Sequence, residues 1–310
     1  MFDLYTIQMI REKKPQFDTR HASRYTPEMI DYISYYGMLS DTFDHYYGYI
    51  DCKKYQIFAN VFIPPRSKGN ILFNHGLYNH TGSHWRFLSY LLEQGYTVLT
   101  YDFPGHGLSS GERFAIGDFS DYTDVMMKVI GTFRKEWKPP YRLTGFSTGG
   151  SCYLDYLLRN NDELFDKTAL VAPLIRSFLW EPSKISYNLV AKRFGALPVP
   201  KFPSYASSDP DFKRRYMSDP LMEWTLPMSW VGALIRWNER IERLPRNDKE
   251  ILVIQGDKDW VVDYKYNLAF LAEKFPNMRL KVISGSKHDV LNETYDIRRA
   301  AYETIVEFLS

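Results

Sequence analysis

Short apolar runs alternate with amphipathic stretches along most of this chain. The runs at 70–74, 96–101, 141–144, 169–172, 251–255 and 279–284 have the length and apolar character of strands in a sheet. Between and after them, helices are predicted over 85–94, 119–137, 151–158, 268–275 and 297–309. Strands that alternate with helices in this way predict an α/β fold whose sheet is mostly parallel.

A different pattern precedes this alternation. Polar and apolar residues alternate over 46–51 and 55–63, which predicts an antiparallel hairpin that ends at Pro64 and Pro65. Residues 1–44 are polar and mixed, with one helix predicted over 27–36. We therefore expect an N-terminal extension at 1–44, followed by the first part of the core at 45–172.

The alternation stops at Pro173 and resumes only at residue 251. The intervening residues are rich in proline, tryptophan, tyrosine and arginine, and they carry helical patterns over 184–194 and 228–244. Because structureless loops of this length are uncommon, we predict a helical cap at 173–248 and a second part of the core at 249–310. The second cap helix places apolar side chains along one stripe, made of Trp230, Leu234, Trp237, Ile241 and Leu244.

Composition narrows the class of protein. Of 310 residues, 45% are hydrophobic and 25% charged, which is enough apolar side chain for a sizeable core. The net charge of +2 gives no indication of a nucleic-acid partner. Cys52 and Cys152 have neither disulfide nor metal-site spacing, and the broken apolar run after Asp3 does not have the pattern of a signal peptide. We therefore expect a cytoplasmic protein.

The candidate chemistry centres on the segment 145–149, which reads G-F-S-T-G. It lies between a predicted strand and a predicted helix, which is the setting of a nucleophile elbow. The serine of such a turn has a strained backbone and needs small neighbours two residues away on each side. The helix that follows directs its free N–H groups and partial positive charge toward the same point. Ser147 is therefore the predicted nucleophile.

A serine nucleophile needs a base, and the base needs an acid that orients it. In the chain order that accompanies such an elbow, the acid follows the serine and the histidine comes last. His288 is the only histidine after Ser147, and it lies in a loop after the last predicted strand. For the acid we choose Asp259, whereas Asp257 is interpreted as closing a turn and Asp263 as capping the next helix.

An oxyanion formed beside Ser147 needs two backbone N–H donors. One belongs to Thr148, the residue after the nucleophile. The other is predicted at Leu77, because His75 and Gly76 allow the backbone to turn inward before it. The predicted oxyanion hole therefore consists of the N–H groups of Leu77 and Thr148.

The remaining histidines offer alternative chemistry. His75, His80 and His84 suggest a metal site, but no carboxylate or cysteine completes a ligand set at the spacing of zinc sites. We therefore predict neither a metal nor another cofactor. His106 precedes Ser147 and lies in a tight Gly-His-Gly turn, which we interpret as structural.

Together these motifs resemble the lysophospholipase and monoacylglycerol lipase branch of the α/β-hydrolases, which is grouped with serine aminopeptidase-like hydrolases. The resemblance spans residues 46–309 and rests on positions 74–76, 102–107 with Ser109, 145–149, 256–259, His288 and an Asp-Pro-Leu at 219–221. It implies an eight-stranded sheet with one antiparallel strand and a cap over Ser147. The chain departs from this branch at Leu77, where a small residue is frequent.

The resemblance implies a cofactor-independent serine hydrolase of carboxylic esters. Its expected substrates are lipid monoesters, such as lysophospholipids or monoacylglycerols, cleaved through an acyl-enzyme on Ser147. We also expect transient contact of the cap with a membrane surface, while the oligomeric state stays open. The apolar stripe of the cap either packs within the molecule or, as we hypothesise, partly lines an acyl tunnel.

Two other functions remain alternatives. A peptidase that acts at a free N-terminus would need an acidic cap residue to bind the ammonium group, and Glu223 and Glu181 are the candidates. A non-catalytic binding protein with a hydrolase fold would usually lack a member of the triad. None is missing from this sequence.

Overall fold

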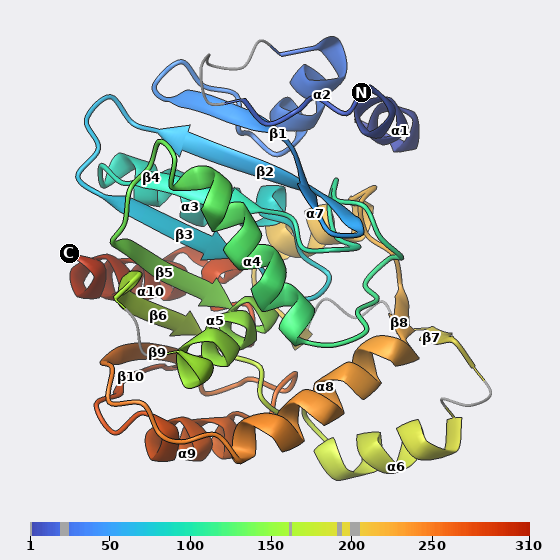
Figure 1. Ribbon diagram of the computed structural model, residues 1–310, viewed down its shortest axis with the longest axis vertical. Helices are drawn as coiled ribbons and strands as arrows, with labels where there is room; N and C mark the ends of the chain where they lie inside the picture. The colour runs from blue at the N-terminus through green and yellow to red at the C-terminus, as the bar shows by residue number, and fades with distance from the viewer. Residues whose placement is uncertain (1, 19–24, 161–162, 191–193, 199–204) are drawn as a thin grey trace.

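An eight-stranded sheet forms the centre of the molecule. The computed structural model describes residues 2–18, 25–160, 163–190, 194–198 and 205–310. The strand order is β1-β2-β4-β3-β5-β6-β9-β10 (Figure 1). The strands are β1 (Asp44–Cys52), β2 (Tyr55–Ile63), β3 (Asn70–Asn74), β4 (Thr97–Tyr101), β5 (Tyr141–Phe146), β6 (Phe165–Val171), β9 (Ile251–Gly256) and β10 (Arg279–Ile283).

The pairing of the strands confirms the predicted α/β class. From β4 across to β10 all neighbouring strands are parallel, whereas β2 runs antiparallel to both β1 and β4. The sheet therefore contains the single antiparallel strand that the family resemblance implies. The predicted hairpin is present as β1 and β2.

Helices cover both faces of the sheet (Figure 1). One core of buried side chains includes α4, α5 and α9, and the other includes α3 and α10. The helices are α1 (Leu4–Lys13), α2 (Pro27–Tyr35), α3 (Trp85–Glu93), α4 (Ser120–Phe133), α5 (Thr148–Arg159), α6 (Trp180–Val190), α7 (Pro210–Ser218), α8 (Met228–Glu242), α9 (Tyr264–Lys274) and α10 (Tyr295–Leu309).

Several predicted boundaries are wrong. Strand β6 begins at Phe165 rather than at 169, and α4 ends at Phe133 rather than at 137. Helix α9 begins at Tyr264 rather than at 268, because the Asp263 side chain accepts a hydrogen bond from the Tyr266 N–H and starts the helix there. Helix α6 lies at 180–190 instead of 184–194, and residues 191–193 of that prediction lie outside the described residues.

The N-terminal extension contains a helix that the sequence analysis missed. Helix α1 begins after Asp3, whose carboxylate accepts a 2.9 Å hydrogen bond from the Thr6 N–H. Ile7 and Ile10 of α1 are buried in the same apolar cluster as residues of the sheet. Beyond α1, backbone hydrogen bonds join residues 15–17 to Tyr49 of β1. The extension thus covers an edge of the sheet and is part of the core packing.

Between β6 and β9 the chain leaves the sheet. This region contains α6, α7 and α8, together with β7 (Ala196–Pro198) paired antiparallel with β8 (Thr225–Pro227). Helix α7 and the β7–β8 pair were not predicted. Helices α6 and α8 lie side by side at the lower right of Figure 1. The division of the chain into an extension, two core parts and an inserted cap stays a prediction.

The apolar stripe of α8 mainly anchors this helix to the core. Trp230, Leu234, Trp237 and Ile241 are buried, and Leu244 is half-buried just beyond the end of the helix. The Nε1–H of Trp237 donates a 3.1 Å hydrogen bond to the Asp155 carboxylate in α5. Packing within the molecule therefore accounts for most of the stripe.

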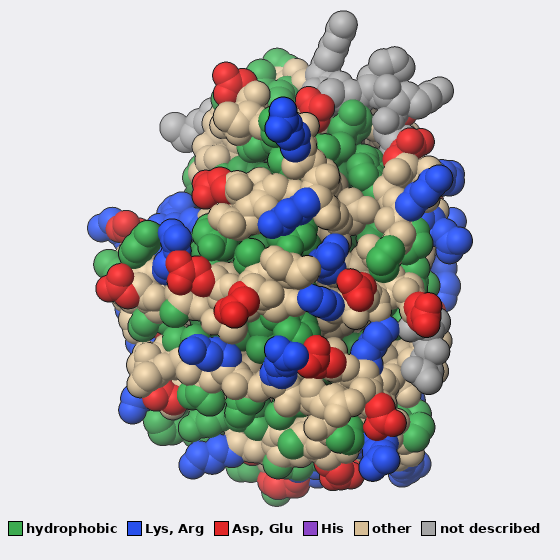
Figure 2. All heavy atoms as spheres, turned by 90° about the vertical axis from the view of Figure 1, so that its left-hand side faces the viewer, with side chains coloured by type: hydrophobic (Ala, Val, Ile, Leu, Met, Phe, Trp, Pro, Cys, Tyr) green, Lys and Arg blue, Asp and Glu red, His purple; other side chains and the backbone are tan. Residues whose placement is uncertain are grey.

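The surface away from α6 and α8 is mixed in charge. Figure 2 shows this face, where Lys and Arg side chains are interspersed with Asp and Glu and no large area carries one sign. In the part of the chain that the structure describes, no helix combines the length and the apolar character needed to cross a bilayer.

Candidate active site

The turn between β5 and α5 holds Ser147 in a strained conformation. Ser147 has φ = 51° and ψ = −113°, which is unusual for a residue with a side chain. Its N–H donates to the Val171 carbonyl at 2.9 Å, and its own carbonyl accepts from the Leu174 N–H at 3.2 Å. The end of β6 and the residues after it therefore hold the strained turn in place.

Two glycines allow the loop after β3 to lie against this turn. A Cβ added at Gly149 would lie 2.2 Å from the carbonyl oxygen of Asn74. A Cβ at Gly76 would lie 3.1 Å from the Cβ of Ser147 and 3.0 Å from the Phe146 ring. Larger side chains at either position would push the loop and Ser147 apart.

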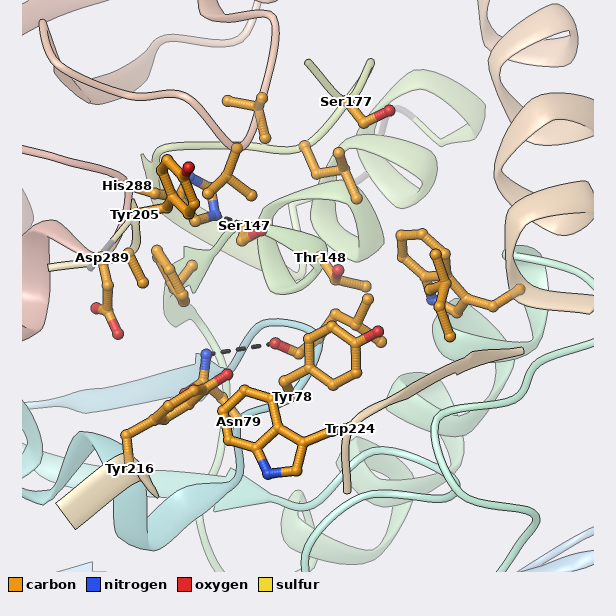
Figure 3. Close-up of a pocket in the computed structure, with 18 of the residues that line it drawn as sticks. Tyr78, Asn79, Ser147, Thr148, Ser177, Tyr205, Tyr216, Trp224, His288 and Asp289 are labelled. Atoms are coloured by element: carbon orange, nitrogen blue, oxygen red, sulfur yellow. Dashed lines mark hydrogen bonds between the residues drawn. The ribbon is translucent and has the colours of Figure 1, made fainter. Parts of the chain in front are cut away.

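The structure brings the three predicted triad residues into one hydrogen-bonded chain. Ser147 follows β5, Asp259 follows β9 and His288 follows β10, so all three lie at the carboxyl end of the parallel strands. The Ser147 Oγ lies 3.0 Å from His288 Nε2 (Figure 3). On the other side of the ring, His288 Nδ1 lies 2.8 Å from Asp259 Oδ2. With a neutral imidazole, the serine hydroxyl donates to Nε2 and Nδ1–H donates to the carboxylate.

Hydrogen bonds keep the Asp259 carboxyl ionised despite its burial. Its Oδ2 also accepts from Gln255 Nε2 at 2.9 Å, and its Oδ1 accepts from the backbone N–H groups of Val261 and Val262. Burial opposes ionisation, but His288 and these donors outweigh it and hold the pKa of Asp259 below its usual value. Gln255 was not predicted; the signal was a polar residue near the end of an otherwise apolar strand.

The other two acidic residues of this loop have structural roles. Asp257 accepts hydrogen bonds from the Gly285 N–H at 2.7 Å and the Ser284 hydroxyl at 3.2 Å, and thereby ties the loop after β9 to the end of β10. Asp263 caps α9. The interpretation of Asp263 is confirmed, whereas the Asp257 side chain bonds to the end of β10 and not within its own turn.

A network around His75 orients the peptide before Leu77. The Phe103 N–H donates to His75 Nε2 at 3.0 Å, so Nδ1 carries the hydrogen and donates to the Gly76 carbonyl at 2.8 Å. In a trans peptide the N–H points opposite to the carbonyl. The Leu77 N–H is therefore directed away from His75. Burial lowers the pKa of His75 to about 3, which keeps the ring neutral.

The other histidines of the region have separate structural partners. His80 Nε2 lies 3.0 Å from Asp219 Oδ2, and His84 Nδ1 lies 3.3 Å from the side-chain nitrogen of Asn292. The Nδ1 of His106 lies 2.8 Å from the Pro104 carbonyl. Within the described ranges, no group of three His, Cys, Asp or Glu side chains is arranged to hold a metal ion.

Ser147 opens into a cavity of about 530 Å³. Leu77, Thr148 and His288 also line it, so the candidate oxyanion donors share the cavity with Ser147 and His288. Its other walls are largely apolar and include Phe146, Leu174, Leu226, Trp230 and Val262. Trp230 is the one member of the α8 stripe that contributes to this lining.

The acidic residues considered for an ammonium site do not contribute to the cavity. Glu223 pairs with Arg113 at 3.2 Å, Glu181 pairs with Lys184 at 2.9 Å, and neither belongs to the lining. The acid that does line the cavity, Asp289, was missed by the sequence analysis. The available signal was its place directly after the candidate base.

Comparison with known proteins identifies the family. Residues 65–295, more than half of the chain, match the family described as "Serine aminopeptidase, S33". The chain is 27% identical to the human protein named monoglyceride lipase over 78% of this chain and 82% of that protein. It is 25% identical to the Haemophilus influenzae protein named probable lysophospholipase L2 over 73% of this chain and 79% of that protein.

A solved structure supports the same fold. A soluble variant of monoglyceride lipase from Saccharomyces cerevisiae, in complex with a substrate analog, superposes with a TM-score of 0.73 at 19% identity and covers 84% of this chain and 94% of that chain. At this identity the similarity concerns the fold alone. The chain therefore belongs to the serine aminopeptidase S33 family and has the α/β-hydrolase fold.

Proposed function

We propose that the protein is a serine hydrolase of carboxylic esters that acts on lipid monoesters. One observation carries this proposal: the Ser147–His288–Asp259 chain lies at the wall of a cavity whose lining is largely apolar. The proteins named monoglyceride lipase and lysophospholipase among the relatives support the same substrate class.

In the proposed mechanism, Ser147 Oγ attacks the ester carbonyl while His288 Nε2 accepts its proton. Asp259 holds the imidazole in the tautomer that presents a free Nε2. The N–H groups of Leu77 and Thr148 stabilise the oxyanion of the tetrahedral intermediate. His288 then protonates the leaving alcohol, and an activated water releases the acyl group from Ser147.

A peptidase that acts at a free N-terminus is the main enzymatic alternative, and a non-catalytic binding protein is the other. A panel of monoacylglycerols, lysophospholipids and aminoacyl amides separates the first alternative from the proposal. Labelling with a fluorophosphonate tests the second, because only an activated serine reacts. The cytoplasmic location stays a prediction.

The apolar lining leads to a prediction about acyl-chain length. Each buried CH₂ contributes about 0.8 kcal/mol, so kcat/KM should rise roughly threefold to fourfold per added methylene until the chain fills the cavity. Substituting Leu226→Trp narrows the cavity, so the highest kcat/KM should shift to esters with shorter acyl chains. The measurement is kcat/KM for a series of p-nitrophenyl esters.

Ile235→Trp is the matched control for this prediction. Ile235 is also a half-buried apolar residue of the region between β6 and β9, but it does not line the cavity. Its variant should keep the chain-length profile of the wild type. A flat or falling profile in the wild type would contradict a lipid substrate while leaving the triad in place.

We also propose that α6 and the loop before it contact a membrane surface. Leu179, Ile185 and Leu189 expose 59%, 61% and 76% of their surface, and Ile185 and Leu189 lie four residues apart on one face of α6. Trp260 and Val261 are also exposed, and Val261 lines the cavity. An apolar surface of this kind would hold a lipid substrate close to the cavity that Val261 lines.

Replacing Ile185 and Leu189 with glutamate should therefore weaken binding to phosphatidylcholine vesicles by roughly tenfold or more, since burial of an aliphatic side chain contributes about 1.5–3 kcal/mol. Co-sedimentation with vesicles measures this effect. A variant with Leu280→Glu and Val282→Glu, which changes two exposed apolar residues of β10, serves as the control. Equal binding by both variants would argue against the proposed contact.

A further inference from the structure

Three aromatic side chains gather at one end of the cavity. Tyr78, Tyr216 and Trp224 all line it, and each is half-buried, so part of each side chain stays accessible. Figure 3 shows them on one side of Ser147, whereas Ser177 lies on the other. We call these three residues the aromatic corner.

Specific contacts hold the aromatic corner together. The ring centroids of Tyr216 and Trp224 lie 5.7 Å apart with an angle of 85° between the ring planes, so the two rings form walls at a right angle. The Tyr78 hydroxyl donates a 3.1 Å hydrogen bond to the carbonyl of Thr225, the residue after Trp224. The cap segment that carries Trp224 is thereby tied to Tyr78.

Tyr78 has a strained backbone. Its φ of 61° lies in the left-handed region, which residues with a side chain rarely adopt and which is frequent at ligand-binding positions. The Tyr78 and Phe114 rings pack edge to face with centroids 4.8 Å apart, and this contact fixes the side chain. The loop that carries the candidate oxyanion donor Leu77 therefore also carries one wall of the aromatic corner.

Negatively charged groups surround this end of the cavity. Burial raises the pKa of Tyr216, and the nearby Tyr78, Asp289 and Asp219 raise it further. Asp289 itself lines the cavity, and burial raises its pKa to about 7, so its carboxyl is partly ionised at neutral pH. A positive charge in the aromatic corner would be attracted by these groups without having to contact them.

Basic side chains are kept out of the main cavity. Among the residues that the structure describes, no lysine or arginine belongs to its lining. Arg113 is paired with Glu223 at 3.2 Å, whereas Arg86 and Arg215 line a smaller cavity of about 50 Å³ that shares Tyr216 with the main one. The main cavity therefore offers rings and a carboxyl to a cation, with no competing positive side chain in its wall.

We propose that the aromatic corner binds a quaternary ammonium group carried by the ester substrate. This inference rests on the proposed ester hydrolase. Aromatic faces attract cations, and they suit a quaternary ammonium group because its methyl groups offer no N–H to a hydrogen-bond acceptor. Two kinds of lipid ester carry such a group: a choline ester of a fatty acid, and a lysophospholipid with a phosphocholine head group.

The first test compares two esters of the same shape, octanoylcholine and 3,3-dimethylbutyl octanoate, which has a carbon atom in place of the nitrogen. In Trp224→Leu the ratio of kcat/KM for the charged ester to that for the neutral one should fall roughly fivefold to tenfold, the effect of losing a cation–π contact. The intrinsic reactivities of the two esters cancel when the variant is compared with the wild type. The assays are run at about pH 8, above the pKa of Asp289.

Matched variants separate recognition of the charge from a structural effect. Tyr216→Leu should lower the same ratio, whereas Tyr216→Phe keeps the ring and should leave it close to that of the wild type. Trp137→Leu changes a half-buried tryptophan that does not line the cavity, and it should leave the ratio unchanged. Labelling by a neutral fluorophosphonate should proceed at a similar rate in all of these variants, because this probe carries no cation.

A second pair of substrates identifies the source of the ammonium group. It consists of the octanoyl esters of glycerophosphocholine and glycerophosphoethanolamine. If Trp224→Leu also lowers the ratio of kcat/KM for this pair, the bound group belongs to a phosphocholine head group. If only the octanoylcholine ratio falls, the source is a choline ester, and either result supports binding of a quaternary ammonium group.

The remaining outcomes distinguish this inference from the proposed function. A wild type that cleaves none of these esters overturns both. A wild type that cleaves them, with ratios that neither Trp224→Leu nor Tyr216→Leu changes, overturns the inference alone and makes the aromatic corner part of the acyl site. A larger loss on the glycerophosphoethanolamine ester than on its choline counterpart would show that a primary ammonium group binds there, and would overturn the assignment of a quaternary one.

Discussion

Replacing Ser147 with alanine should lower ester turnover by about 10⁴-fold or more. The variant lacks the oxygen that, in the proposed mechanism, attacks the ester carbonyl and forms the acyl-enzyme. The fold should remain intact, because alanine keeps the Cβ in the same strained backbone conformation and the turn is held by Val171 and Leu174. Turnover is measured with a p-nitrophenyl ester, and folding is checked by the melting temperature.

Ser151→Ala is a matched control for this prediction. Ser151 lies one turn further along α5, and its hydroxyl bonds to the Leu174 carbonyl rather than to His288. This variant should retain most of the turnover and should still react with a fluorophosphonate. Turnover of Ser147→Ala near the wild-type level would exclude Ser147 as the nucleophile.

Asp259→Asn should lower turnover by about 10⁴-fold, the typical loss when the carboxylate that orients the base is replaced by an amide. The Gln255 side chain and two backbone N–H groups already donate to Asp259, so the amide oxygen can replace only one carboxylate oxygen. An NH₂ group toward His288 Nδ1 would favour the tautomer that cannot accept the serine proton.

Asp257→Asn and Asp263→Asn test the choice of acid under the same conditions. Neither side chain contacts His288, since Asp257 bonds to residues 284 and 285 and Asp263 caps α9. Asparagine caps a helix N-terminus as well as aspartate does, so Asp263→Asn should leave both the activity and the stability close to those of the wild type. If the largest loss of turnover occurred at either of these positions, the assignment of Asp259 would be wrong.

The sequence could predict the sheet and the residues of the triad because both have local signals. Strands such as β3 and β9 are buried on both faces, and this requirement appears as continuous apolar runs. The elbow has a similar local signature, because a strained turn pressed against β3 requires small residues around Ser147. Because the acid and then the histidine follow the serine in the chain, few residues remained as candidates for these two positions.

The helices that the sequence analysis missed lack such signals. Half of the residues of helix α1 are polar, and its stability comes from Ile7 and Ile10 packing in the cluster beside the sheet. Helix α7 is rich in charged residues, with Phe212 as its buried side chain. Asp209 before Pro210 is a typical helix start, but apolar residues at helical spacing do not follow it. Tertiary packing therefore decided both helices.

By itself the sequence determined the α/β class, the nucleophile elbow and the candidates Ser147, Asp259 and His288, because strand burial and backbone strain act on neighbouring residues. The tertiary structure alone decided the cavity and the environment of Asp289. That carboxyl is buried by segments far apart in the chain, and one of its oxygens is left without a donor. For a loop side chain such as Asp289, burial and hydrogen-bond pairing depend on surroundings assembled from distant segments, so no pattern along the chain could reveal them.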